Sequence, residues 1–414
     1  MSEPRTPARE HYDAVVDLAT SPEEHYALVL VKFTYRLTPR GAVLDAPEPL
    51  LHDLRDPEQE PRLVPGTDFW PRKLFTDVVV EGSAFTPGGR PAQQMVVTAA
   101  VGNRTKRVQV TGRRVVEWSE RGTPRFSQPE PFTEVPLVWE NSYGGLDWRA
   151  EDPEVLTRDP LELAAMLQID HPGLYPRNPF GRGYLVSPEP VDGVELPLVE
   201  DPEDLLTPER LITRDPHLWY RQPVPGGLGW MHPMMFPRYV HAPEGPDAWF
   251  PGPEDAGMPE VRRGFVIPNY RTIGGQRRLE DGPAPMFFQG ASHGMVFSDL
   301  AAGLPVRITG MHPLGARTEF TVPGPPSIEM AVDGRYEHVQ PRLHSLVVRP
   351  GSDQFYVLFG ATMPITRPMM PGIHKHIPIA AAINGDAPIV YDAPVPMMER
   401  LATAMGTGEA PKEE

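Results

Sequence analysis

Apolar and polar residues alternate over a long run near the start of the chain. Within residues 26–37 every odd position is apolar, whereas the even positions change from leucine to the polar residues Lys32, Thr34 and Arg36. A repeat of two residues is typical of a β-strand. The pattern therefore predicts a long strand with one fully buried face and a second face that meets water toward its end.

A second group of strand patterns follows. Residues 77–80 are rich in valine, and the turn residues of 86–91 interrupt the pattern before β-branched residues return at 95–101 and 106–111. A Gly-Asn pair separates the last two runs, and glycine supplies the positive φ that tight turns need. This stretch predicts an antiparallel meander in which 86–91 is a hairpin loop.

The strand pattern returns after residue 286. Asp333 and Gly334 lie between two alternating runs, which is the strongest short-range signal for a hairpin. We therefore expect a second β-rich region here. Its six candidate strands cover residues 305–311, 317–322, 328–332, 335–339, 343–349 and 354–359.

The middle of the chain, from residue 123 to about 285, differs in composition, because prolines recur every few residues. One helix is expected at 159–167, where an Asp-Pro pair can cap its first turn. Single helical turns are expected at 201–204 and 207–210 for the same reason. The remainder is expected to form long ordered loops.

The composition supports a β-rich fold. The chain has 54 prolines and 37 glycines among 414 residues, and proline inside a helix removes a hydrogen-bond donor. We expect a mainly β protein, with antiparallel sheets in two sandwich-like lobes, a long proline- and glycine-rich loop region and few short helices. The expected divisions are a lead-in at 1–25, an N-terminal lobe with the loop insertion at 26–285, a C-terminal lobe at 286–396, and a terminal helix with an acidic tail at 397–414.

Charge and composition narrow the possible functions. The formal net charge is −16, whereas sequence-independent nucleic-acid binding and anionic membranes both require basic surfaces. No cysteine is present, which excludes disulfides, thiolate catalysis and cysteine-bound zinc. No apolar run reaches the roughly 20 residues of a membrane span, and the N-terminal residues lack a signal-peptide pattern. We therefore expect a cytoplasmic protein that binds neither nucleic acid nor membranes.

Four strings carry a more specific signal: Thr76–Pro91, Glu130–Gly145, Asn178–Gly183 and Leu196–Pro202. Together, and in this order, they resemble a family whose members are encoded beside spike, PAAR-like tip and toxin genes of type VI secretion. The resemblance runs, with gaps, from about Tyr26 to about Pro364. It implies a non-enzymatic cytoplasmic adaptor or chaperone without a cofactor, whose partners are an effector, a PAAR-like tip protein and the spike protein.

The sequence also departs from the pattern of that family. Ser83 stands where the family usually has a histidine, and residues 358–361 stand where its last strand tends to end in a Trp-Arg pair. Residues 214–263 match poorly, and the segment after Ile365 has no counterpart. Neither a polar role at position 83 nor a role for the final segment is therefore carried over.

Candidate partner-binding residues follow from side-chain chemistry. Arg90 lies in a turn of proline and glycine, and Arg182 lies between two glycines, so either guanidinium can approach a carboxylate closely. An internal ion pair of Arg182 with Glu200 or Asp201 is the alternative. Aromatic residues crowd the loop-rich middle and suit a protein interface, although they can equally form the core of the loops. The aromatic candidates are Trp139, Tyr143, Trp219 and Trp230.

Two other classes of function remain open. Gly290–Gly294 match the G-x-S-x-G pattern of serine hydrolases, and Ser292 would form a triad with Asp333 and either His338 or His344. That pattern has meaning only where a strand-to-helix turn surrounds the serine. The hydrolase alternative therefore requires a short helix after Ser292. The second alternative is a β-sandwich module that binds glycans through exposed tryptophans.

The sequence predicts neither a metal nor a cofactor. His374 and His376 place two imidazoles on one face of a strand, but no third ligand is placed beside them, although Asp386 or Asp392 could add one. Solvated histidines are therefore the expectation. No phosphate-binding loop and no dinucleotide-binding glycine motif is present.

Overall fold

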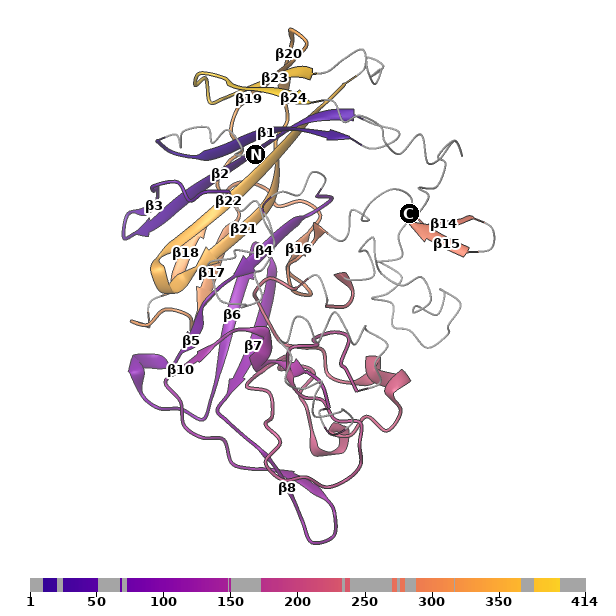
Figure 1. Ribbon diagram of the computed structural model, residues 1–414. Coiled ribbons are helices and arrows are strands. Elements are labelled where there is room, and N and C mark those ends of the chain that lie inside the picture. Colours follow the sequence, from indigo (N-terminus) through magenta and orange to yellow (C-terminus); the bar gives the residue numbers. More distant parts are fainter. Residues whose placement is uncertain are drawn as a thin grey trace, which may run out of the picture.

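The computed structural model shows a mainly β protein (Figure 1). Its described helices are short 3₁₀ turns, of which the longest is η6 (Pro216–Arg221). The expected fold class, with several antiparallel sheets, is confirmed. The helix expected at 159–167 and the terminal helix expected within 397–414 lie outside the described residues. The structure describes residues 10–20, 25–50, 68, 73–147, 149, 173–232, 235–238, 270–273, 276–279, 288–315, 317–365 and 376–394.

The largest sheet has seven strands and joins distant parts of the sequence. Its order is β1-β2-β22-β21-β4-β16, with β3 paired to β2. All neighbours are antiparallel except β21 and β4, which are parallel. The long strand predicted at 26–37 is confirmed as β2, whereas part of the expected lead-in forms the edge strand β1. The strands are β1 (Asp13–Thr20), β2 (His25–Thr38), β3 (Gly41–Leu44), β4 (Thr76–Val80), β16 (Val296–Phe297), β21 (Arg342–Arg349) and β22 (Gln354–Pro364).

The second face of β2 meets water at Arg36 but not at the two polar residues before it. Lys32 and Thr34 are each 1% exposed. The ammonium of Lys32 lies 3.1 Å from a carboxylate oxygen of Asp68 and 4.0 Å from the ring centre of Tyr356, and it donates a hydrogen bond to the carbonyl of Pro49. These partners replace water around the buried charge. The prediction is confirmed at Arg36, which is exposed, but was wrong at Lys32 and Thr34, because residues outside the strand cover that part of the face.

The second sheet has five antiparallel strands in the order β13-β7-β6-β17-β18. Gly102 and Asn103 join β6 to β7, and Gly102 has a φ of +57°. This predicted hairpin is therefore confirmed. The strands are β6 (Gln94–Val101), β7 (Arg104–Thr111), β13 (Val199–Glu200), β17 (Pro305–Thr309) and β18 (Thr318–Thr321).

Two parts of the predicted meander were wrong. β4 lies in the seven-stranded sheet beside β21 and does not pair with β6. The turn at 86–91 is not a hairpin loop, because β5 (Ser83–Phe85) before it pairs with β10 (Glu134–Pro136) and not with the strand after it. It contains the tight 3₁₀ turn η1 (Pro87–Gly89), with both glycines at positive φ. The turn chemistry is therefore local, whereas the strand partners are distant in sequence.

The third sheet lies at one end of the molecule, beside β1 (Figure 1). Its order is β20-β19-β23-β24. Asp333 and Gly334 form the predicted hairpin between β19 and β20, with φ of +52° and +77°. The sequence pattern did not predict β23 and β24, although alternate residues of β23 are buried. The strands are β19 (Ile328–Val332), β20 (Arg335–Val339), β23 (His376–Ile383) and β24 (Ile389–Pro394).

One apolar core joins the three sheets. It includes Val29 of β2, Val97 of β6 and Ile379 of β23, all fully buried. Phe320 of β18 stacks on Phe355 of β22, with ring centres 4.0 Å apart. The two larger sheets each combine strands from both sides of the expected boundary at 285/286, so neither sheet belongs to one half of the chain.

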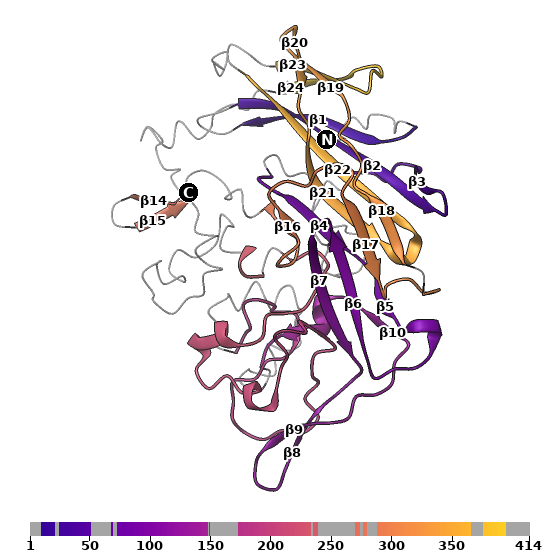
Figure 2. The ribbon, with the colours of Figure 1, turned by 180° about the vertical axis from the view of Figure 1, so that it is seen from behind.

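The proline-rich middle has a smaller core of its own. Tyr143, Tyr175 and Tyr184 meet there, with ring centres 5.1 to 6.4 Å apart. Figure 2 shows this part of the chain lying beside the β6–β7 hairpin, where β13 pairs with β7. The turns expected at 201–204 and 207–210 are confirmed, the second as η5 (Pro208–Arg210).

Short pairs of strands complete the described elements. None of the helices in the described residues has the length and apolar character to cross a membrane. The pairs are β8 (Val116–Trp118) with β9 (Pro124–Phe126), β11 (Tyr143–Gly144) with β12 (Arg182–Gly183), and β14 (Tyr270–Ile273) with β15 (Gln276–Leu279).

Candidate functional site

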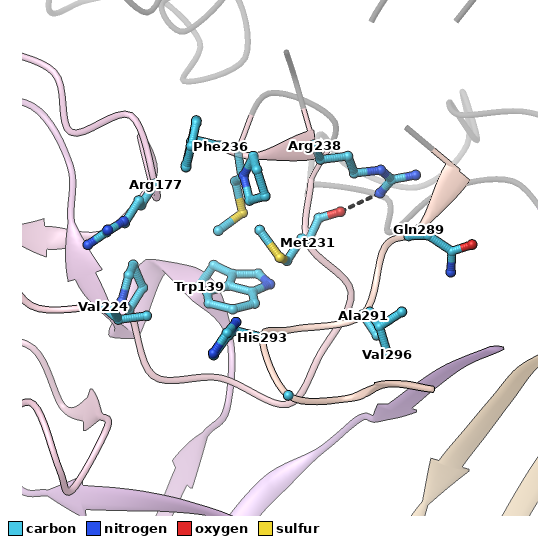
Figure 3. Close-up of a pocket in the computed structure, with 14 residues that line it drawn as sticks. Trp139, Arg177, Val224, Met231, Phe236, Arg238, Gln289, Ala291, His293 and Val296 are labelled. Atoms are coloured by element: carbon cyan, nitrogen blue, oxygen red, sulfur yellow. Dashed lines mark hydrogen bonds between the residues drawn. The ribbon is translucent and has the colours of Figure 1, made fainter. Parts of the chain in front are cut away.

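A pocket with a volume of about 290 Å³ lies beside β16, where the proline-rich middle meets the seven-stranded sheet. Its walls are mostly apolar (Figure 3). Among the described lining residues, every charged or titratable side chain is basic, namely Arg177, Arg238 and His293. The apolar lining residues are Trp139, Val224, Pro225, Met231, Met235, Phe236, Pro237, Ala291 and Val296.

Backbone contacts hold the walls of the pocket together. Trp139 belongs to η2 (Trp139–Asn141), and its indole N–H donates to the carbonyl of Trp230. Trp230 forms an antiparallel bridge with Ala291. A Cβ atom on Gly227 would lie 2.6 Å from the Trp139 ring, so this position has no room for a side chain. These contacts preform the pocket, whose lining residues come from four separate segments of the chain.

A buried ionic network next to the pocket fixes the segment that leads into β16. A carboxylate oxygen of Asp77 on β4 lies 2.5 Å from Nζ of Lys73, and both side chains are fully buried. Asp77 also accepts hydrogen bonds from the backbone N–H of Gly290 at 2.8 Å and the side-chain amide of Gln289 at 2.9 Å. Burial lowers the pKa of Lys73, while the adjacent Asp77 opposes that shift. Three donors thus satisfy one buried carboxylate.

Arg238 contributes a buried cation to one wall. It is 2% exposed, and its guanidinium donates a hydrogen bond to the carbonyl of Met231 (Figure 3). Burial lowers the pKa of Arg238 to about 10, and the charge of Asp77 acts against that shift. Arg238 therefore stays protonated at pH 7, with Asp77 as its nearby countercharge.

Arg177 lies on the opposite side of the cavity from Arg238 (Figure 3). It is half-buried, and its guanidinium carbon lies 5.4 Å from the ring centre of Trp219. It donates hydrogen bonds to the carbonyl of Gln222 at 3.2 Å and to the hydroxyl of Tyr175 at 3.4 Å. Within the described part of the chain, these partners of Arg177 are all neutral. Its charge is therefore not compensated by an ion pair there.

His293 lines another part of the wall, and Lys106 hydrogen-bonds to its backbone. The ammonium of Lys106 donates to the carbonyl of His293 at 2.6 Å and to the hydroxyl of Ser292 at 3.4 Å. Burial lowers the pKa of Lys106 to about 8. Burial, together with Lys106, lowers the pKa of His293, so its imidazole is neutral at pH 7. The pocket thus offers apolar surface and fixed donors, an arrangement suited to binding.

One protein-family model matches the part of the chain that contains the pocket. The family model described as an uncharacterized protein conserved in bacteria (DUF2169) matches residues 23–359. This chain belongs to the DUF2169 family. The matched region contains all the described residues of the pocket and lies close to the range of the resemblance seen in the four strings. A search of curated proteins and a search of solved structures found no match.

The G-x-S-x-G segment of this DUF2169 protein lacks the surroundings of a nucleophile elbow. Ser292 is fully buried, and the next described element is β16, which pairs antiparallel with β4. The short helix that the hydrolase alternative requires after the serine does not occur in the described residues 295–302. Asp333 and His338 belong to the β19–β20 hairpin at the far end of the molecule, and the structure does not bring them to Ser292 (Figures 1 and 2).

The six predicted partner-binding residues do not form one cluster. Trp139 lines the pocket, and Trp230 lies behind its wall, with the ammonium of Lys73 5.0 Å from its ring centre. Arg90 is exposed beside the η1 turn, away from the pocket. Two of the six thus contribute to the candidate site.

Two of the aromatic candidates belong to the loop core instead. Tyr143 is 1% exposed. Trp219 is partly buried and packs edge-on against Tyr175 and Phe236, with ring centres 6.3 and 5.2 Å apart. Burial supports a structural role for Tyr143, whereas Trp219 does not line the pocket and contacts two residues that do, Arg177 and Phe236.

Arg182 forms an internal ion pair, but with a different carboxylate from the predicted ones. Its Nη1 lies 2.8 Å from an oxygen of Glu195. The prediction of Glu200 or Asp201 as its partner was wrong, because Glu200 is buried and pairs with Arg114 at 2.5 Å. The Arg182 ion pair helps to hold the loops beside β12.

The two histidines weighed as a possible metal pair are only partly described, because His374 lies outside the described residues. His376 begins β23 and is exposed. No group of three potential ligands among histidine, aspartate and glutamate occurs within the described residues. No metal site is assigned.

Sequence reasoning missed Arg177, Arg238 and the Lys73–Asp77 pair. Arg177 directly precedes the Asn178–Gly183 string, which was a usable signal for it. Asp77 lies within the Thr76–Pro91 string, but Arg238 carries no such signal, and the two charges come together only when the loop-rich middle folds over β4.

Proposed function

We propose that this DUF2169 protein is a non-enzymatic adaptor that binds another protein, and that its partner is an effector or a PAAR-like tip protein which it helps to load onto the type VI secretion spike. The observation that carries the proposal is the pocket of tryptophan, methionine and phenylalanine with basic side chains around it. Aromatic residues, methionine and arginine are the residue types enriched at the centres of protein interfaces.

The chemistry of the walls supports protein binding. Met231 and Met235 have flexible, polarizable side chains that adapt to differently shaped apolar partners. An adaptor that covers an apolar patch on its client also protects the client from aggregation. The link to type VI secretion rests on the resemblance of the four strings and not on the pocket.

The net charge supports a protein partner in a different way. At −16, the chain repels nucleic acid and anionic membranes and attracts basic proteins at long range. Long-range attraction affects how fast partners meet, whereas the groups inside the pocket decide what binds there.

Co-purification tests the proposal. The tagged chain is expressed with the neighbouring tip, toxin and spike genes, and we expect one of their products to co-purify with it and to lose solubility when it is absent. Failure of all three to co-purify, with client solubility unchanged, would remove the proposal. Labelling by a fluorophosphonate probe that disappears in Ser292→Ala would support the hydrolase alternative instead.

A further inference from the structure

We propose that the pocket beside β16 binds a short segment of the client in which a large apolar side chain stands next to a carboxylate. The apolar side chain would enter between Trp139, Met231 and Met235, and the carboxylate would bind Arg177. This inference deepens the proposed function and rests on it. It names the chemistry of the client segment that the adaptor recognises.

The charges around the pocket favour an acidic group on the bound client segment. No carboxylate occurs among the described lining residues, although the whole chain carries a net charge of −16. Arg238 has Asp77 as a countercharge, whereas the hydrogen-bond partners described for Arg177 are neutral. A partly buried guanidinium binds a carboxylate through two parallel hydrogen bonds. Arg177 is therefore the group that remains available to an anion.

The apolar walls favour a client segment in which a large apolar side chain lies next to that carboxylate. The volume of about 290 Å³ is just below the range of roughly 300–1,000 Å³ typical of small-molecule sites. A space of this size suits one large side chain with its neighbouring backbone. The contact of the Arg177 guanidinium with the Trp219 ring also restricts it before the partner arrives, which reduces the entropy lost on binding.

Site-specific photo-crosslinking tests the location. The photoreactive amino acid p-benzoylphenylalanine replaces Met231 in the pocket or, as a control, Tyr336, which is 69% exposed on the distant strand β20. The full chain is produced with the tip, toxin and spike genes. We expect Met231 to give adducts with a segment of one of their products that holds a large apolar residue beside Asp or Glu, and Tyr336 to give no such adducts.

The outcomes separate the two proposals. If a client co-purifies but Met231 gives no adduct, or adducts only with basic or uncharged segments, the inference is overturned and the adaptor function stands. If no client co-purifies, the proposed function fails and the inference fails with it.

Affinity measurements test the role of Arg177. The probe is a fluorescent synthetic peptide with the sequence of the crosslinked segment, measured by anisotropy. We expect Arg177→Gln to weaken binding about tenfold or more, Arg177→Lys to recover part of the loss, and the exposed control Arg107→Gln to change nothing. Replacing the peptide carboxylate by an amide should weaken binding to the wild type but not further to Arg177→Gln. Equal affinity of wild type and Arg177→Gln, with thermal unfolding unchanged, would overturn the assignment.

Discussion

Two lysines lie inside the β core with a carboxylate beside each. Lys32 contacts Asp68, and Lys73 contacts Asp77. Such buried pairs contribute little net stability compared with apolar residues, but the loss of one partner leaves an uncompensated charge. These pairs fix the positions at which loops contact the sheet. Asp77, for example, also accepts a hydrogen bond from Gly290 beside the pocket.

The interior has no room for a side chain at Gly360 on β22. A Cβ atom there would lie 2.1 Å from the ring of His344, which is buried at the β-bulge of β21. We expect Gly360→Ala to lower the free energy of unfolding by about 1–3 kcal/mol or more, because the ring and two strands must shift. Denaturant unfolding measures this change. The control Gly324→Ala, with open space around its Cβ, should stay within roughly 0.5 kcal/mol; equal effects at both positions would contradict the prediction.

His344 also makes stability depend on pH. Burial, with Lys73 and Arg342 nearby, lowers its pKa from 6.5 to about 3. Its neutral form thus contributes stability that is fully present above pH 6.5 and is lost as the pH falls toward 3, because the unfolded chain binds the proton first. We expect His344→Gln to reduce the slope of unfolding free energy between pH 6 and 4 by about 1.4 kcal/mol per pH unit. The exposed control His338→Gln should leave the slope unchanged, and an unchanged slope in His344→Gln would refute the role of this histidine.

At the scale of elements, burial differs sharply between strands. β4 is buried at every position and pairs in parallel with β21 on one side and antiparallel with β16 on the other. β20 is an edge strand whose side chains are exposed except the last, which is partly buried. Strands buried on both faces open only when the surrounding structure opens, whereas edge strands open locally.

Amide hydrogen exchange should follow this difference. We expect the amides of β4 and β22 to exchange slowest and those of β20 to exchange fastest among the three sheets, because β20 lacks a neighbour on one side. Mass spectrometry of exchanged peptides measures the rates. Protection of β20 equal to that of β4 would show that another element covers this edge.

At the scale of the whole molecule, the two larger sheets interleave the ends of the chain. β4 pairs with β21 across more than half of the sequence, and β6 pairs with β17. The β2–β22 pair holds the early and late strands along eleven positions. Such long-range pairing means that the strands of residues 26–285 complete their sheets only with the strands that follow.

A fragment of residues 26–285 should therefore not fold alone. It lacks β21, β22 and β17, so the apolar faces of β2, β4 and β6 would meet water. We expect weak near-UV circular dichroism and poor dispersion in NMR spectra, whereas a chain ending at residue 396, which keeps all described strands, should retain both signals. A well-folded 26–285 fragment would instead support two independent lobes.

Local patterns in the sequence determined the class of this protein and many of its elements. The alternation at 26–37 determined the long strand β2, and the Gly102–Asn103 and Asp333–Gly334 pairs determined two hairpins. These features depend on residues that are neighbours in the chain, where φ, side-chain period and turn chemistry act directly. The net charge and the four strings likewise come from the sequence alone.

Only the tertiary structure decided which strands pair and where the candidate site lies. The parallel partner of β4 and the burial of Lys32 under Tyr356 both depend on segments distant in sequence. The pocket depends on them most, because its walls come from η2, the segment of Arg177, the loop that ends at Arg238 and residues 289–296 at the start of β16. Burial and ion pairing are decided by what else occupies the space, and a one-dimensional pattern holds no such information for residues a hundred positions apart.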